Sequence, residues 1–167
     1  GHPGPASIEG VEMKDFELAM DLNLRTILVT TEAAIPEMKT RGGGAFLFTA
    51  STSGLQGSMF SPVYSMAKFG VVGFARALAG RLAAENIRVN AICPGIVETD
   101  IIRTAQQKML ETGMSALAFK AAIEDQIPMG RMLQVEEIAP IATYLASAES
   151  NGMTGQTITI SGGMRMG

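Results

Sequence analysis

A tyrosine and a lysine one helical turn apart are the residues of this chain best suited to chemistry. Tyr64 and Lys68 are four positions apart, so on a helix both side chains project from the same face. A neighbouring ammonium favours the phenolate and lowers the pKa of a tyrosine from its ordinary value of about 10. The pair therefore suits general acid/base catalysis at a substrate oxygen. The structural alternative is a packed tyrosine beside a solvated lysine.

A serine at the end of an apolar run offers a second group for such a site. Ser51 follows residues 45–50, a nearly all-apolar run that is typical of a strand buried on both faces. Open α/β sheets bind ligands at the carboxyl ends of their strands. A hydroxyl there can donate to a substrate oxygen as negative charge develops on it. Alternatively the hydroxyl caps backbone groups, and Thr52 and Ser53 compete for either role.

The elements that must position these groups alternate between helices and short apolar runs. This alternation predicts an α/β protein with a parallel sheet. The expected helices span about 13–39, 63–85, 101–111, 115–126 and 135–147, and the expected strands 45–50, 88–93 and 157–160. Asn86 is the expected stop of the second helix. We expect the Met-rich helices within residues 101–126 to form a mobile lid.

The chain lacks the Gly-rich turn on which a doubly wound sheet binds a dinucleotide. Strand 45–50 would then be an apolar, unprotected sheet edge, which natural proteins usually avoid. We therefore expect residues 1–167 to form a single domain that belongs to a larger sheet. The remainder would be absent, cleaved away or supplied by another chain.

Two segments resemble the catalytic stretch of the short-chain dehydrogenase/reductase family. These are residues 50–54 and 64–68, and the family places its serine thirteen positions before its tyrosine, as Ser51 and Tyr64 are placed here. Further resemblances lie at Asn23, at residues 90–95 with Glu98 and Thr99, and at residues 128–131, 154–156 and 162–163. They cover essentially the whole chain. Residues 96–100 and the C-terminal end are also similar to the 3-oxoacyl-carrier-protein reductase branch.

The resemblance implies a catalytic role for each of four residues. Tyr64 would protonate the carbonyl oxygen during reduction, and Ser51 would hold that oxygen. Lys68 would hydrogen-bond the nicotinamide ribose and lower the tyrosine pKa. Asn23 would interrupt its helix and help to order a water in a proton relay toward Lys68.

The resemblance also implies NAD or NADP as cofactor and a Rossmann-type doubly wound parallel sheet, here without its N-terminal strands. The cofactor-binding residues it implies are Tyr64, Lys68, Pro94, Gly95, Ile96 and Thr99. Without the Gly-rich turn, the pyrophosphate and adenosine would have no binding place. We therefore expect this chain alone to bind cofactor poorly and to be inactive.

Composition restricts the kinds of binding partner and the cellular compartment that we expect for this protein. The net charge of −3 and the absence of a basic cluster argue against nucleic acid. No apolar run has the length of a membrane span, no signal peptide opens the chain, and the single cysteine cannot form an internal disulfide. We expect a cytoplasmic protein without a metal site, because no His/Cys/Asp/Glu grouping has metal-ligand spacing. Cys93 is expected to be a small buried residue.

The helix 63–85 is apolar on more than one face, which predicts a subunit interface and a homo-oligomer, either a dimer or a tetramer. Burial under a missing segment of the same chain is the alternative. The leading hypothesis is an NAD(P)-dependent oxidoreductase that interconverts an alcohol and a carbonyl of a small molecule by hydride transfer. The alternatives are a non-catalytic oligomerisation or interaction module of the same fold, and an inactive truncated copy of the enzyme.

Overall fold

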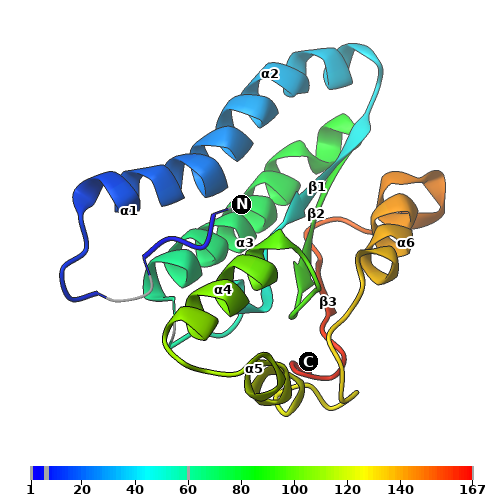
Figure 1. Ribbon diagram of the computed structural model, residues 1–167. Helices are drawn as coiled ribbons and strands as arrows, with labels where there is room; N and C mark the ends of the chain where they lie inside the picture. Colours follow the sequence, from blue (N-terminus) through cyan, green and yellow to red (C-terminus); the bar gives the residue numbers. More distant parts are fainter. Residues whose placement is uncertain (1, 6–7, 60, 167) are drawn as a thin grey trace.

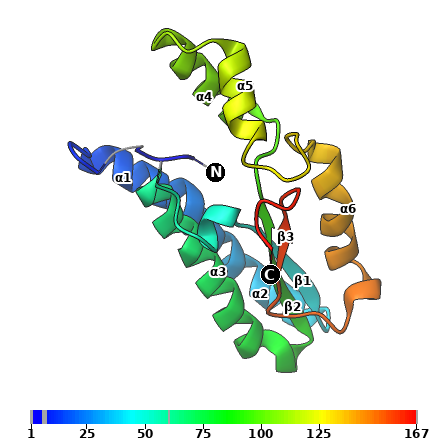
Figure 2. The ribbon, with the colours of Figure 1, turned by 90° about the horizontal axis from the view of Figure 1, so that it is seen from below.

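The computed structural model describes residues 2–5, 8–59 and 61–166, and within them three strands form one parallel sheet. The strands are β1 (Gly44–Thr49), β2 (Ile87–Pro94) and β3 (Thr157–Ile160), in the order β1-β2-β3. Both pairings of the central strand β2 are parallel, with Thr49 opposite Ile92 and Ile92 opposite Ile158. Helices lie on both faces of the sheet (Figure 1, Figure 2). The predicted α/β fold with a parallel sheet is therefore confirmed.

The first helical run covers the expected region but changes its hydrogen bonding in the middle. α1 (Met13–Met20) leads into a π-helix at Asp21–Arg25, and α2 (Thr26–Thr40) follows. π-Turns of this kind are inserted into longer α-helices, frequently at functional sites. Asn23 lies at the centre of the π-turn and is 2% exposed. The predicted interruption of the helix at Asn23 is confirmed.

α3 (Pro62–Leu82) carries Tyr64 and Lys68 and packs along the sheet. Pro62 occupies the first turn, where the missing N–H of a proline would have no helical partner. A short 3₁₀ turn, Ala83–Glu85, and Asn86 in the left-handed conformation (φ 57°) end the helix, as predicted. The Asn86 side-chain amide donates to the Gly42 carbonyl at 2.9 Å, which ties the end of α3 to the turn before β1.

The main core lies between the sheet and the face of α2 and α3. Phe46 and Phe48 project from β1 into it, and the Phe48 ring lies 5.8 Å from that of Phe74 on α3. The opposite face of the strand is only half-buried at Ala45 and Leu47. The prediction of a strand buried on both faces is therefore wrong for β1. β1 lies at the edge of the sheet described, where α6 (Val135–Ala146) covers its second face incompletely.

α4 (Asp100–Glu111) and α5 (Ala116–Glu124) follow β2 and stand apart from the sheet (Figure 2). No residue of α4 is buried, and Ile123 is the buried residue of α5. We call residues 100–124 the α4–α5 lobe. Its position beyond the end of β2 agrees with the expected lid, and its mobility stays a prediction. No helix in the described ranges combines the length and hydropathy needed to span a membrane.

Asn90 joins β2 to the segment that leads into β3. Its side chain is 1% exposed, donates to the Met153 carbonyl at 2.8 Å and accepts from the Gln156 backbone N–H at 3.0 Å. These two bonds satisfy backbone groups that no sheet partner reaches. The Asn90 side chain thus provides the hydrogen bonds that a neighbouring strand would otherwise make to the backbone of the segment before β3.

Asn90→Ala should lower the free energy of unfolding by about 2–4 kcal/mol, because two backbone groups lose their partners. Urea denaturation of both proteins measures this difference. Gln156→Ala is the control, because it removes only an exposed side-chain bond to the Thr154 carbonyl and should cost less than about 0.5 kcal/mol. Equal effects of the two substitutions would contradict the role given to Asn90.

Candidate active site

Ser51, Tyr64 and Lys68 come together where β1 ends and α3 begins. The Ser51 hydroxyl and the Tyr64 phenol are within hydrogen-bonding reach of each other. The Lys68 ammonium lies 5.5 Å from the centroid of the Tyr64 ring and donates to the carbonyl of Thr49, the last residue of β1, at 2.9 Å. The three side chains therefore share one location at the carboxyl end of the sheet.

A close backbone contact explains how the Ser51 loop is held against α3. Ser51 caps the 3₁₀ turn Thr52–Gly54 by accepting from the Ser53 backbone N–H at 3.1 Å. A Cβ atom at Gly54 would lie 2.5 Å from the Lys68 carbonyl oxygen and 2.7 Å from its carbon. Only a glycine lets the turn pack this closely on the helix. This contact sets the separation of Ser51 from the two α3 side chains.

Asn23 faces the same region from the π-turn. Its side-chain amide donates to the carbonyls of Ala19 and His2, both at 2.8 Å. Its buried Oδ1 has no hydrogen-bond partner among the described residues. Asn23 and Lys68 both line a cavity of about 190 Å³, together with Leu22, Ile27, Leu47, Phe48 and Thr49. The cavity is partly open, and it brings the Asn23 side chain and the buried Lys68 side chain to one space.

The acid–base properties of the pair differ from the prediction. Burial raises the pKa of Tyr64, the Ser51 bond opposes that rise, and nearby Cys93 adds to it. Burial also lowers the pKa of Lys68. The predicted lowering of the Tyr64 pKa by Lys68 is therefore wrong for this chain. The reason is desolvation of the phenolate, while the lysine amine is directed to the Thr49 carbonyl rather than to the phenol oxygen.

Cys93 is a neighbour of this site that sequence reasoning treated only as buried packing. It is 0% exposed, and the Ser51 backbone hydrogen-bonds to its sulfur. Burial raises the pKa of the thiol, and the charges of Lys68 and Arg76 oppose the rise. Its location follows from the parallel register of β1 on β2, in which Thr49 pairs with Ile92. No sequence motif specifies that register.

Above about pH 9, wild-type protein should lose more stability than a Cys93→Ala variant. The pKa of the folded-state thiol lies above its ordinary value of 9.0, so the stability from its bound proton is complete below that pH. This stability is lost as the pH rises through the folded pKa. Tyr64, with its pKa raised above 10.0, acts in the same direction, and Lys68, with its pKa lowered from 10.5, acts in the opposite one.

Because Tyr64 and Lys68 are present in both proteins, the difference between the two stability curves reports the Cys93 thiol together with its effect on the pKa values of these two neighbours. Urea unfolding at several values between about pH 8 and 11 measures it. Two curves that stay parallel over this range would contradict the assignment.

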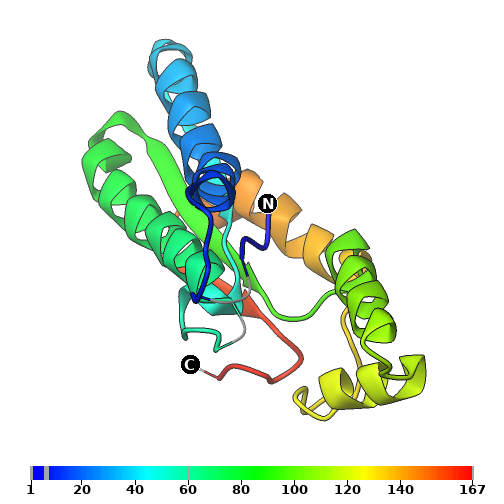
Figure 3. The ribbon, with the colours of Figure 1, turned by 60° about the vertical axis from the view of Figure 1, so that its left-hand side comes forward.

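The implied cofactor-binding residues Pro94, Gly95, Ile96 and Thr99 lie from the last residue of β2 to the residue before α4. Figure 3 shows the green segment that leads from the sheet to α4. The Gly95 N–H donates to the Ile160 carbonyl at 2.9 Å, and a Cβ atom at Gly95 would lie 2.9 Å from Ser161 Cα. The Ile96 carbonyl accepts from the Leu133 N–H at 3.0 Å. The Thr99 hydroxyl donates to the Val97 carbonyl at 3.3 Å. The segment is thus fixed beside the carboxyl end of the sheet.

The chain belongs to the short-chain dehydrogenase/reductase family, and its fold is that of the family. Residues 2–165 match the family model described as enoyl-(acyl carrier protein) reductase. The chain is 35% identical over 156 residues to the 3-oxoacyl-(acyl-carrier-protein) reductase FabG of Thermotoga maritima, covering 92% of the chain and 59% of the relative. It is 38% identical over 148 residues to the acetoacetyl-CoA reductase of Shinella zoogloeoides, covering 89% and 58%.

Solved structures show the same similarity. Actinorhodin polyketide ketoreductase with NADPH superposes with a TM-score of 0.91 at 32% identity, covering 98% of this chain and 64% of that one. L-sorbose reductase of Gluconobacter frateurii, complexed with NADPH and L-sorbose, gives a TM-score of 0.91 at 27% identity, covering 100% and 64%. The chain spans about three fifths of the length of the relatives it matches.

Proposed function

We propose that the full-length protein containing this chain is an NAD(P)-dependent oxidoreductase that interconverts an alcohol and a carbonyl on a small molecule. The convergence of Ser51, Tyr64 and Lys68 at the end of β1 carries this proposal. Membership of the short-chain dehydrogenase/reductase family supports it. Both solved structures described above contain NADPH, so NADPH is the first cofactor to test.

The residues present fit a nicotinamide cofactor. An ammonium has three N–H donors, and Thr49 is its one hydrogen-bond acceptor from the described residues. The other donors suit ribose hydroxyls. Ile96 and Thr99, held beside the same end of the sheet, would contact the nicotinamide, with Pro94 and Gly95 shaping the turn. When bound, NAD(P) supplies or accepts the hydride, and the protein contributes orientation and polarisation.

The hydroxyl groups of Ser51 and Tyr64 would act on the carbonyl oxygen. Ser51 donates a hydrogen bond that stabilises the negative charge developing on that oxygen. Tyr64 then transfers its phenolic proton to the oxygen, which completes the alcohol. Since burial raises the Tyr64 pKa, the phenol is protonated at neutral pH and is ready to serve as the acid in the reducing direction.

Lys68 and Asn23 would return a proton to Tyr64 after each turnover. Asn23 Oδ1 lacks a described partner and lines the same cavity as Lys68. A water in that cavity could accept from Lys68 and donate to the asparagine oxygen. Such a chain would give Lys68, which lies beside the Tyr64 ring, a route to solvent protons while the substrate covers the other side of the site.

Kinetic assays on the full-length protein test the proposal. A panel of small ketones, sugars, steroids and acyl thioesters is offered with NADPH and with NADH, and the oxidation of the nicotinamide is followed. Carbonyl-dependent oxidation with at least one substrate is the expected result. Absence of turnover with the whole panel, together with no binding of either cofactor by nicotinamide fluorescence, would refute the proposal. The chain of residues 1–167 alone should bind cofactor weakly, since it lacks the Gly-rich turn.

We also propose that the protein is a homo-oligomer formed through α3. Opposite its buried face, the helix has an exposed stripe of residues at helical spacing. The stripe consists of Met66, Phe69, Gly73, Ala77 and Gly80. A Cβ atom at Gly73 or Gly80 would meet nothing within 4 Å, so a second helix has space to approach closely. Sedimentation at micromolar concentration should show a dimer or tetramer, and a stable monomer would contradict the assignment.

A further inference from the structure

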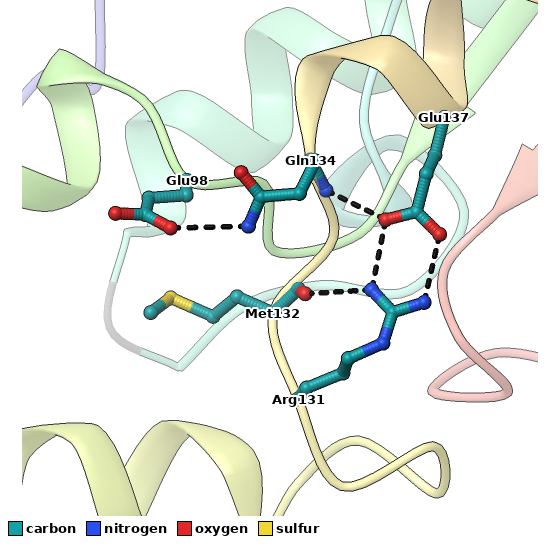
Figure 4. Close-up of polar contacts among 5 residues, drawn as sticks. All are labelled: Glu98, Arg131, Met132, Gln134 and Glu137. Atoms are coloured by element: carbon teal, nitrogen blue, oxygen red, sulfur yellow. Dashed lines mark hydrogen bonds and ion pairs between the residues drawn. The ribbon is translucent and has the colours of Figure 1, made fainter.

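Four side chains from two distant segments meet at the base of the α4–α5 lobe (Figure 4). Arg131 donates from Nη1 and Nη2 to the two carboxylate oxygens of Glu137, each at 2.8 Å. Glu137 also accepts from the Gln134 backbone N–H at 2.8 Å, and the Gln134 side chain donates to Glu98 at 3.0 Å. We call Glu98, Arg131, Gln134 and Glu137 the clasp. It joins the start of the lobe to the start of α6.

A backbone bridge lies directly beside the clasp. Val97 pairs in parallel with Leu133, which is 3% exposed. The Glu98 N–H donates to the Leu133 carbonyl at 2.9 Å, and the Leu133 N–H donates to the Ile96 carbonyl at 3.0 Å. The same strand-like contact therefore fixes the entry to the lobe, the exit from it and the backbone of Ile96.

The clasp also borders a cavity of the lobe. Glu98 and Met132 line a space of about 380 Å³ between α4 and α5, with Ile102 and Phe119 on its walls. The Met132 carbonyl accepts from Arg131 at 3.2 Å. Since α4 has no buried residue and packs mainly on α5, the base of the lobe is what orients this cavity. A change in the clasp would therefore move the cavity as a unit.

We infer that the clasp positions the α4–α5 lobe over the reacting groups and so controls the binding of the carbonyl substrate. This inference rests on the proposed function. A bidentate arginine–carboxylate pair fixes direction as well as distance, which suits it to set the angle of a lobe. An exposed ion pair contributes little to global stability. The effect of breaking it should therefore appear in substrate binding rather than in unfolding.

Glu137→Gln in the full-length protein is the main test. Glutamine at the third position of a helix can still close a capping box, so α6 keeps its start while the forked pair with Arg131 is lost. We expect the KM for the carbonyl substrate to rise about three- to tenfold with kcat within about twofold, the pattern of lost binding rather than lost chemistry. Hydrogen exchange of the backbone amides of Glu98 and Leu133 should become faster.

Glu37→Gln is the matched control. It removes an equally short exposed pair, Arg41 Nε to Glu37 Oε1 at 2.7 Å, on α2 and away from the lobe. Its KM and its amide exchange at residues 98 and 133 should equal those of wild type. Arg131→Lys keeps the charge without the fork and should reproduce at least half of the KM change of Glu137→Gln.

Three outcomes would overturn the inference: an unchanged KM in Glu137→Gln, an unchanged amide exchange at both bridge residues, or a fall in kcat as large as the rise in KM. Failure of the proposed function would look different. Wild-type protein would then show no carbonyl-dependent turnover, and the exchange measurement alone would still decide whether the clasp holds the lobe.

Discussion

Tyr64→Phe should lower kcat for carbonyl reduction by about a thousandfold, within the range that removal of a general acid usually causes. The substitution keeps the aromatic ring beside Lys68 and removes the phenolic hydroxyl that we propose as the proton donor. Cofactor binding should change little, because Lys68 and the segment after β2 remain in place. Steady-state kinetics with a substrate found in the panel measures the loss.

Tyr144→Phe is the control for this variant, since Tyr144 is the other tyrosine of the chain and lies on α6. It should retain nearly full kcat. The unfolding free energy of Tyr64→Phe should fall by no more than about 1 kcal/mol, the usual effect of one hydrogen bond. A Tyr64→Phe enzyme that keeps more than a tenth of wild-type turnover would refute the acid role.

Gly54→Ala should destabilise the protein by about 3 kcal/mol, a cost typical of a methyl group forced into a packed interior. The new Cβ would overlap the Lys68 carbonyl group, with calculated separations of 2.5 and 2.7 Å. Both contacts are to backbone, so no side chain can rotate away. Either the Ser51 turn or the first turns of α3 must move, and kcat should fall together with stability. Urea unfolding and steady-state kinetics measure the two effects.

Gly57→Ala is the matched control for this substitution. Gly57 lies three residues further along the same loop, is exposed, and has open space around its would-be Cβ atom. Its unfolding free energy should stay within about 0.5 kcal/mol of wild type. If both variants were equally stable, the close packing of the Ser51 turn on α3 would be wrong.

Hydrophobic periodicity and turn residues were sufficient to predict the order of helices and strands, because a helix or strand depends mainly on residues close together in the chain. The start of the first helix at Met13 and the end of α3 at Asn86 were predicted from such local signals. The relative position of Tyr64 and Lys68 follows from helix geometry alone. The approach of Ser51 to them does not, since it depends on the fit of Gly54 against a distant carbonyl group.

Properties that arise from long-range packing could not be predicted. The direction of the Tyr64 pKa depends on how much solvent the folded chain removes, and local pairing with Lys68 suggested the opposite sign. The half-buried second face of β1 depends on how far α6 extends over it. The bond between Glu98 and Gln134 joins residues 36 positions apart, and no local pattern marks such a pair.

The π-turn at Asp21–Arg25 determines the rotational phase between α1 and α2. Deleting one residue there would restore regular α-helical bonding, but it would rotate α1 by about 100° and draw it in by about 1.5 Å. Ala19, the buried residue of α1, would then turn away from α3, and its carbonyl would no longer reach the Asn23 amide. The π-turn therefore determines which face of α1 is directed toward α3. A single-residue deletion within the π-turn should destabilise the protein more than a substitution at any exposed position of α1.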